Sequence, residues 1–486
     1  MIMIDFRPIL NICGLLMVIM AVAMIFPALA DIASNNPDFN VFITTAALTA
    51  FIGGALYLAT RTDVPTELSR RQAFALTTGA WLSVSLVGAL PFVFYGGSMS
   101  WADAIFESVS GITTTGATVI SGLEAQPPGI LLWRHVLQWI GGVGVILMAI
   151  IMLPFLGVGG MQLFETENSE RSGRIVPRAR QFVVYISAIY SALTIVCMAV
   201  YMVLGMGAFD ALCHAMSTIA TGGFSTHDAS FGYFESAPLQ WAGTFFMVAG
   251  GIPFVAYIRF VRGRGDALFG DVQIRAFLIF LAVVSILLGL WLSTTMHANS
   301  IEEGLRMAAF NVVSIVTTTG FATSDYSMWG TTSAGLFFAL LFVGGCTGST
   351  SGGIKIYRHQ ILWTAVRSYV RQLTSPHRVD VLSYGDLHVT REVQASVLAF
   401  LAVFVGAFSV TAVLLAAMGL DLVTAISASA TAFSNVGPGI GDIIGPSGNF
   451  GPLVDEAKWV LSGAMLLGRL ELFTVLVLLD PDYWRG

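Results

Sequence analysis

Four short phrases rich in threonine and glycine are the residues of this chain best suited to bind an ion. They read SGITTTGATVISG (110–122), STIATGGFSTHD (217–228), SIVTTTGFATSDY (314–326) and ATAFSNVGPGIGD (430–442). Rings of backbone carbonyls and hydroxyls can replace the hydration shell of a monovalent cation, whereas divalent cations usually take carboxylates. The phrases therefore predict a monovalent cation site, provided that the fold brings them together.

The spacing around the phrases indicates a repeated unit. Asp103 and Asp210 each stand 13 residues before the glycine of their phrase, and Phe106 and Phe310 each stand 10 residues before theirs. The phrases recur about every hundred residues, each between two apolar runs. Such recurrence is typical of an architecture built by repetition. Closer helix packing by small residues is the alternative explanation of each phrase taken singly.

The composition places these phrases in a lipid bilayer. The chain has 486 residues, of which 56% are hydrophobic and 11% charged, whereas soluble domains carry roughly 25% charged residues. Most of its apolar runs approach the roughly 20 residues that a membrane span requires. These runs are 9–30, 39–60, 73–95, 130–156, 181–208, 238–258, 276–294, 332–346, 395–420 and 457–480. We therefore expect an all-α polytopic membrane protein, with the first run retained as a helix.

The segments before the phrases are too short to cross a bilayer. Only about ten residues precede each phrase, at 103–113, 210–220, 304–317 and 422–434. We expect each to enter the membrane as a half-helix and return, which is tolerated only where protein surrounds the backbone or where it lines a watery cavity. Four such loops around one axis meet this condition, with their negative helix ends directed at the ion.

The distribution of Lys and Arg predicts the orientation. Most of the 23 basic residues lie in the connections 61–71, 171–180, 259–275 and 355–391. Basic connections remain in the cytoplasm, so we expect both termini there and the four phrases on the outer side. No long basic tract indicates a nucleic-acid partner, and no H-E-x-x-H, G-x-S-x-G or complete P-loop motif indicates an enzyme.

A glycine-rich segment, GGCTGSTSGGIK (344–355), interrupts the run that begins at residue 332. Each glycine costs a helix about 1 kcal/mol relative to alanine, and Ile354 occupies the lysine position of a nucleotide-binding loop. We expect a flexible gate loop beneath the ion site; a helix kink for packing is the alternative. The gate loop comprises Gly344, Gly345, Cys346, Thr347, Gly348, Ser349, Thr350, Ser351, Gly352 and Gly353.

One arginine, Arg469, lies inside the last apolar run. Charges within a membrane are costly and usually face a cavity or a partner, so Arg469 is either an electrostatic barrier to cations or half of an ion pair between repeats. Glu471 is two residues away and does not face Arg469 on a helix, which makes Glu107 a candidate partner. Glu107, His214 and Glu471 are also the few candidates for a proton relay.

These phrases, together with LQWIGGVGVI, FVGGCTGSTSGGIK and LLGRLELFTVLVLL, resemble the Trk/Ktr/HKT superfamily of potassium transporters from about residue 70 to the end. The helices expected at 9–60 resemble its TrkH family rather than the shorter Ktr type. The resemblance implies four pseudo-symmetric M1-P-M2 pore-loop repeats (helix, pore loop, helix) around one pore, plus two extra N-terminal transmembrane helices. The expected parts are the N-terminal pair at 1–62 and repeats at 70–165, 178–262, 270–375 (with a broken second helix) and 388–486.

The resemblance also implies the function and the ion site. It implies K⁺ uptake across the bacterial inner membrane through a gated, channel-like pore, with K⁺ in the pore and no covalent cofactor. The implied partners are a second copy of the chain, in a homodimer, and a TrkA-like cytosolic nucleotide-binding regulatory subunit. The implied filter positions are Thr114, Thr115, Gly116, Thr221, Gly222, Gly223, Thr318, Thr319, Gly320, Asn435, Val436 and Gly437. A secondary K⁺ symporter coupled to H⁺ or Na⁺ is the alternative.

The fourth phrase departs from the other three. Asn435 and Val436 stand where the first and third phrases have threonines, and Pro438 follows the glycine. We therefore expect an ion site without fourfold symmetry and a looser discrimination between K⁺ and Na⁺.

Overall fold

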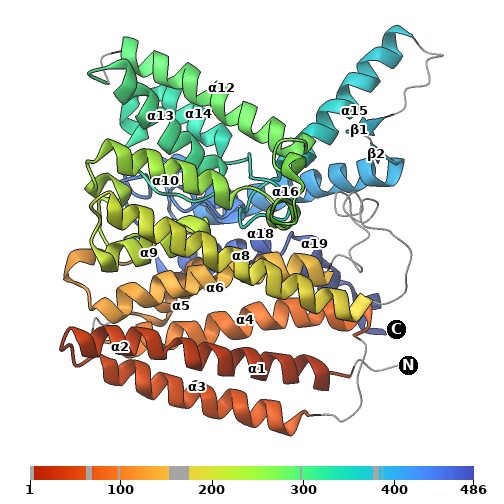
Figure 1. Cartoon of the computed structure of the whole chain (residues 1–486). Helices are drawn as coiled ribbons and strands as arrows, with labels where there is room; N and C mark the ends of the chain where they lie inside the picture. The colour runs from red at the N-terminus through yellow and green to blue at the C-terminus, as the bar shows by residue number, and fades with distance from the viewer. Residues whose placement is uncertain are drawn as a thin grey trace.

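The computed structural model describes residues 5–61, 68–96, 99–152, 175–295, 298–375, 382–385 and 387–485, and these residues are mostly helical (Figure 1). By length and composition alone, seven helices in these ranges can cross a membrane, or nine if two bent pairs each count as one span. The protein is therefore a multi-pass membrane protein. The basic connection at 171–174 lies outside the described residues.

The long helices follow the predicted apolar runs. They are Arg7–Ala23 (α1), which the nine-residue Ile25–Ala33 (α2) extends, Phe39–Ala59 (α3), Arg70–Phe94 (α4), Pro128–Met152 (α6), Ile175–Val203 (α8), Val272–Thr294 (α12) and Arg391–Ala417 (α16). Short elements connect them or follow them. These are Leu123–Ala125 (η1), Ser230–Tyr233 (η2), Gly265–Ala267 (η3), Tyr326–Trp329 (η4), Val477–Leu479 (η5), Pro481–Arg485 (α20) and the antiparallel strands Ser383–Tyr384 (β1) and Leu387–His388 (β2).

Four shorter helices precede the threonine–glycine phrases, as the sequence predicts. They are Trp101–Ile112 (α5), Ala208–Ile219 (α9), Ile301–Val316 (α13) and Leu422–Ser434 (α17). They contain 12 to 16 residues, or about 18–24 Å at 1.5 Å per residue, which is less than the roughly 30 Å of a hydrocarbon core. Capping side chains fix where three of them begin: Ser100, Ser300 and Asp421 each accept a hydrogen bond from a backbone amide of the first turn.

The second long helix of a repeat is bent or broken in three cases, whereas the sequence predicts only one interruption. Ala237–Gly250 (α10) and Phe254–Val261 (α11) meet at 92°, and Asp455–Arg469 (α18) and Phe473–Leu479 meet at 104°. The expected interruption separates Thr331–Leu340 (α14) from Ile356–Thr374 (α15). Continuous spans over 238–258 and 457–480 were therefore wrong.

Each unexpected bend has a local cause. At the first, Pro253 has no amide hydrogen to continue the helix. At the second, Glu471 and Leu472 adopt positive φ angles of 57° and 52°, which lie outside the right-handed helical region. The short helix Phe473–Leu476 (α19) resumes directly afterwards.

Three of the short helices pack on their own repeat and on a helix of a neighbouring one. The helix α5 packs on α4, α6 and α18, α9 packs on α8, α10 and α6, and α13 packs on α12, α10 and α14. Their apolar residues form two main cores. Phe106 of α5 and Phe433 of α17 belong to one core, and Ile219 of α9 and Phe310 of α13 belong to the other. Most buried apolar residues of α5 and α17 thus lie in one core, and most of those of α9 and α13 lie in the other.

The two ends of the described chain meet at one end of the helix bundle (Figure 1). The ring of Phe6 stacks on Trp484 at 6.3 Å, and Gln72 Nε2 at the start of α4 donates to the Asp5 carbonyl at 2.9 Å. N-terminus, C-terminus and the connection before α4 therefore lie together.

Candidate ion-binding site

All four short helices end in the same turn. The residue after the last helical turn has a left-handed conformation, with φ between 50° and 57°, at Thr114, Thr221, Thr318 and Asn435. The next amide then donates to the carbonyl five residues back, at 2.8 to 3.1 Å: Thr115 to Ser110, Gly222 to Ser217, Thr319 to Ser314 and Val436 to Thr431. This is the hydrogen bond of a Schellman motif, and it fixes the chain direction after each helix.

Three of the four turns begin with a left-handed threonine rather than a glycine. A β-branched residue rarely adopts this conformation, and strained backbone of this kind costs about 1–3 kcal/mol and tends to occur at functional sites.

The filter glycines, Gly116, Gly223, Gly320 and Gly437, bring the four turns into a closed ring. Each has a positive φ, from 78° to 105°. A Cβ added to any of these glycines would meet a carbonyl oxygen of another repeat. The oxygen belongs to Gly222 for Gly116, and to Thr319 for Gly223. It belongs to Val436 for Gly320, and to Thr115, at 2.6 Å, for Gly437. Each repeat therefore touches the next through a glycine and a carbonyl, and the fourth returns to the first.

A hollow of about 190 Å³ borders this ring. The filter glycines of all four repeats line it, as do Phe224 and Pro438. Of the twelve predicted filter positions, one glycine from each phrase therefore lines this hollow. The oxygens available in the four turns are neutral backbone and hydroxyl oxygens, a set that suits a monovalent cation better than a divalent one. The described residues contain no group of three or more His, Cys, Asp or Glu that could hold a metal ion.

The gate loop lies directly against this ring. Gly352 N donates to Thr318 Oγ1 at 2.6 Å, and the hydroxyls of Thr221 and Thr350 are 3.1 Å apart. Thr350 Oγ1 also donates to the Ile219 carbonyl at the end of α9 at 3.1 Å. Two filter turns are therefore hydrogen-bonded to this loop.

The bend between α10 and α11 holds the gate loop in place. Cys346 N donates to the Gly251 carbonyl at 3.1 Å, and Phe254 N donates to the Gly348 carbonyl at 2.9 Å. Nearly all of the loop is buried. In this conformation the loop is tied to its surroundings, so any opening must break several hydrogen bonds.

Arg469 is the last residue of α18 and reaches the gate loop. Its Nη1 donates to the Thr350 carbonyl at 2.9 Å, its exposed fraction is 7%, and its Nε and Nη2 have no hydrogen-bond partner within the described residues. The proposed pairing with Glu107 was wrong, because Glu107 binds Arg134 at 2.7 Å. Glu471 binds Arg358 at 2.8 Å. Within the described chain, Arg469 therefore has no acidic partner.

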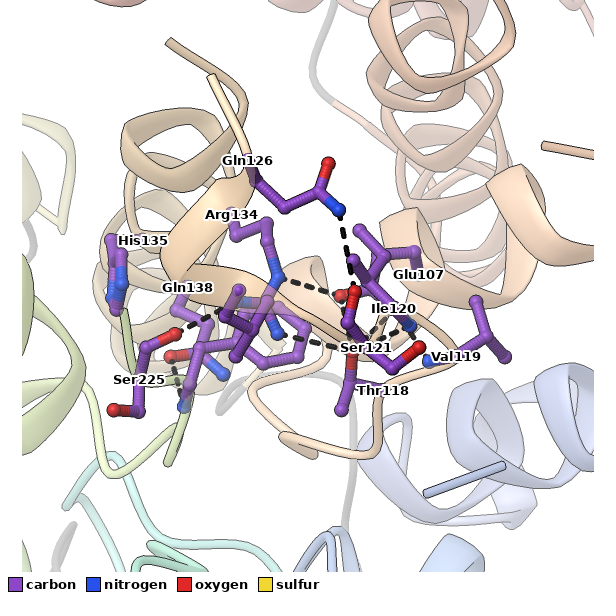
Figure 2. Close-up of polar contacts among 12 residues, drawn as sticks. Glu107, Thr118, Val119, Ile120, Ser121, Gln126, Arg134, His135, Gln138 and Ser225 are labelled. Atoms are coloured by element: carbon purple, nitrogen blue, oxygen red, sulfur yellow. Dashed lines mark hydrogen bonds and ion pairs between the residues drawn. The ribbon is translucent and has the colours of Figure 1, made fainter. Parts of the chain in front are cut away.

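Two polar residues of α6 that the sequence did not single out, Arg134 and Gln138, lie beside Ser225, which follows the second turn (Figure 2). Gln138 Nε2 donates to the Gly222 carbonyl, and its Oε1 accepts from Phe224 N at 3.1 Å. Arg134 Nη1 donates to the Ser225 carbonyl at 2.8 Å. Both stand in a mostly apolar run, where the cost of burying a polar group could have identified them.

The sequence matches the TrkH family of cation transport proteins over residues 37–484. The chain belongs to this family. The resemblance inferred from the phrases is thereby confirmed, and the family is one of transport proteins rather than enzymes.

Relatives of similar length carry the names of one transport system. The Trk system potassium uptake protein TrkI of Halomonas elongata is 43% identical over 479 residues, which cover 98% of this chain and 97% of that protein. The Trk system potassium uptake protein TrkH of Escherichia coli K12 is 35% identical, with 99% of both chains covered. The crystal structure of the potassium transporter TrkH from Vibrio parahaemolyticus superposes with a TM-score of 0.92 at 35% identity, covering 99% of this chain and 100% of that one.

Proposed function

We propose that this protein carries K⁺ into the cell through a single pore built from four M1-P-M2 repeats. The closed ring of filter glycines and neighbouring carbonyls carries this proposal, because a ring of neutral oxygens around one axis is what a dehydrated alkali ion requires. The names of the relatives, which are potassium uptake proteins over nearly the whole chain, support the choice of ion.

The gate loop and Arg469 are proposed to control the same pore on its inner side. The loop lies against two filter turns, and Arg469 places a positive charge on it through Thr350. Such a charge opposes the passage of a cation. A cytosolic TrkA-like nucleotide-binding subunit is proposed to move the loop, and a second copy of the chain completes the assembly in the bacterial inner membrane, with both termini in the cytoplasm.

Conduction is favoured over coupled symport. A proton relay requires ionisable groups inside the membrane that are free to exchange protons. Two of the three candidates, Glu107 and Glu471, are held in ion pairs with arginine. Current that persists in liposomes without a proton or Na⁺ gradient would support conduction, and current that requires either gradient would support the symporter.

The function is tested by rescue of growth at limiting K⁺ in a bacterial strain that lacks its own uptake systems. We expect rescue with this chain, and stronger rescue when a TrkA-like subunit is expressed with it. Reversal potentials of the purified protein in mixed K⁺ and Na⁺ then measure selectivity. Absence of both rescue and K⁺ current, with protein present in the membrane, would overturn the proposal.

A further inference from the structure

Each short helix carries a different residue at the position nine before its filter glycine. In chain order these residues are Glu107, His214, Asn311 and Ala428. All four side chains are buried within the described structure. Three of the four repeats therefore bury a polar group at a position where the fourth repeat accepts a methyl group.

The three polar side chains all bind the return limb of their own repeat, meaning the residues directly after the filter glycine (117–120, 224–226 and 321–323). Glu107 accepts from Thr118 Oγ1 and from Val119 N, both at 2.9 Å. His214 Nε2 lies 2.9 Å from Ser225 Oγ. Asn311 Nδ2 donates to Thr323 Oγ1 at 2.9 Å, and its Oδ1 accepts from Thr323 N at 3.3 Å. One helix position thus anchors the same part of three loops.

The first of these anchors also joins two repeats (Figure 2). Arg134 Nε binds Glu107 at 2.7 Å, its Nη1 donates to the Ser225 carbonyl at 2.8 Å, and its Nη2 donates to Thr118 Oγ1 at 3.1 Å. The exposed fractions of Arg134 and Glu107 are 1% and 0%. One ion pair therefore ties the return limb of the first repeat to that of the second.

The fourth return limb is held in another way. Ala428 offers no hydrogen bond, and Pro438 directly after the filter glycine fixes the backbone φ. Gly439 N then donates to the Ile444 carbonyl at 2.7 Å. Ser427 Oγ, one residue before Ala428, donates to the Ile440 carbonyl at 3.2 Å, so the side-chain contact to this limb comes from the neighbouring helix position.

We propose that Glu107, His214 and Asn311 are positioning residues that hold the return limbs, and thereby set the spacing of the filter oxygens and the preference for K⁺ over Na⁺. Buried ion pairs often stabilise a fold no more than apolar residues of similar volume, and the fourth repeat shows that alanine packs at this position. Stability alone therefore does not explain three polar groups aimed at the same limb. The proposal rests on the proposed function and names the residues behind its selectivity.

The test compares variants of the full-length protein reconstituted in liposomes. Glu107→Gln keeps the size of the side chain but removes the charge that Arg134 requires, and Asn311→Ala removes an uncharged anchor without burying a free charge. Asp103→Asn is the matched control, because Asp103 lies on the same helix as Glu107 and binds Lys458 at 2.6 Å without touching a return limb. Reversal potentials give the permeability ratio, and thermal unfolding reports stability separately.

We expect the K⁺/Na⁺ permeability ratio to fall roughly tenfold in Glu107→Gln, the lower end of the loss found when partners of metal ligands are removed. We expect a smaller fall in Asn311→Ala and no change in Asp103→Asn, even if its melting temperature drops. Unchanged ratios in the first two variants, with K⁺ current intact, would overturn the inference and leave the proposed function standing. A wild-type protein without K⁺ current would overturn the proposed function itself.

Discussion

The ring of filter turns has two unlike halves. The turns of the second and third repeats are hydrogen-bonded to the gate loop, through Thr221 and Thr318. The turns of the first and fourth repeats are bonded to each other, with Asn435 Nδ2 donating to Thr115 Oγ1 at 2.9 Å. The backbone turn is the same in all four repeats, but its side chains bind different partners. In the second and third repeats they bind the gate loop, and in the fourth repeat the side chain binds the first turn.

The left-handed residue of the fourth turn differs from that of the other three. Asparagine adopts this conformation more readily than a β-branched residue, so Asn435 is the least strained of the four. The threonines in the second and third turns keep a costlier conformation where their hydroxyls bind the gate loop. The departure in the fourth phrase, expected as a loss of hydroxyl ligands, thus preserves the backbone geometry of the ring.

The largest loss of K⁺ uptake is expected from a change at a filter glycine. In both halves of the ring, each filter glycine packs against a carbonyl oxygen of the next repeat. Gly223→Ala would bring a Cβ against the Thr319 carbonyl oxygen, and we expect a nearly complete loss of K⁺ uptake in the growth assay. Gly122→Ala is the control, because Gly122 has a similar φ of 67° but open space around it. It should cost about 1–2 kcal/mol of local strain and retain uptake; equal loss in both variants would contradict the ring.

Removing the charge beside the gate loop should have the next largest effect. Arg469→Ala deletes a buried cation that contacts Thr350, and we expect a severalfold rise in K⁺ flux into liposomes without the regulatory subunit. Arg469→Lys keeps the charge and should keep the flux low. A similar rise in both variants would show that the hydrogen bond, and not the charge, limits the flux.

A direct comparison of the two halves uses one substitution at equivalent positions. Thr318→Val leaves the buried Gly352 amide without its acceptor, which costs about 1–3 kcal/mol and should raise resting flux by loosening the gate loop. The Thr114 hydroxyl has no hydrogen-bond partner within the described residues, so Thr114→Val should change flux little. A large effect of Thr114→Val would instead indicate that this hydroxyl contacts the ion.

The smallest effect is expected from the fourth turn. Asn435→Gly keeps the left-handed turn but loses the donors to Thr115 Oγ1 and to the Met465 carbonyl, which contribute about 0.5–1.5 kcal/mol each. We expect a lower melting temperature in detergent with K⁺ uptake retained. Asn435→Thr is the comparison, since it restores the residue of the other turns at the cost of a strained backbone. A loss of selectivity in Asn435→Gly alone would assign the amide an ion-binding role.

The sequence by itself determined the membrane location, the fourfold recurrence of the threonine–glycine phrase and the position of the glycine in each turn. These features depend on local composition and on spacing along the chain, because a bilayer requires long apolar runs and a left-handed turn favours glycine. The short helices were predictable for the same reason: their length is fixed by the residues between two longer runs.

Only the tertiary structure decided which residues meet. The contacts that close the ring and the contact of Thr318 with Gly352 join segments that are distant in the chain. Glu107 pairs with Arg134, 27 residues away, rather than with Arg469. Arg358 pairs with Glu471, 113 residues away. A buried polar group needs a hydrogen-bond partner. Its sequence neighbours do not identify that partner, because packing brings together groups that are distant in the chain.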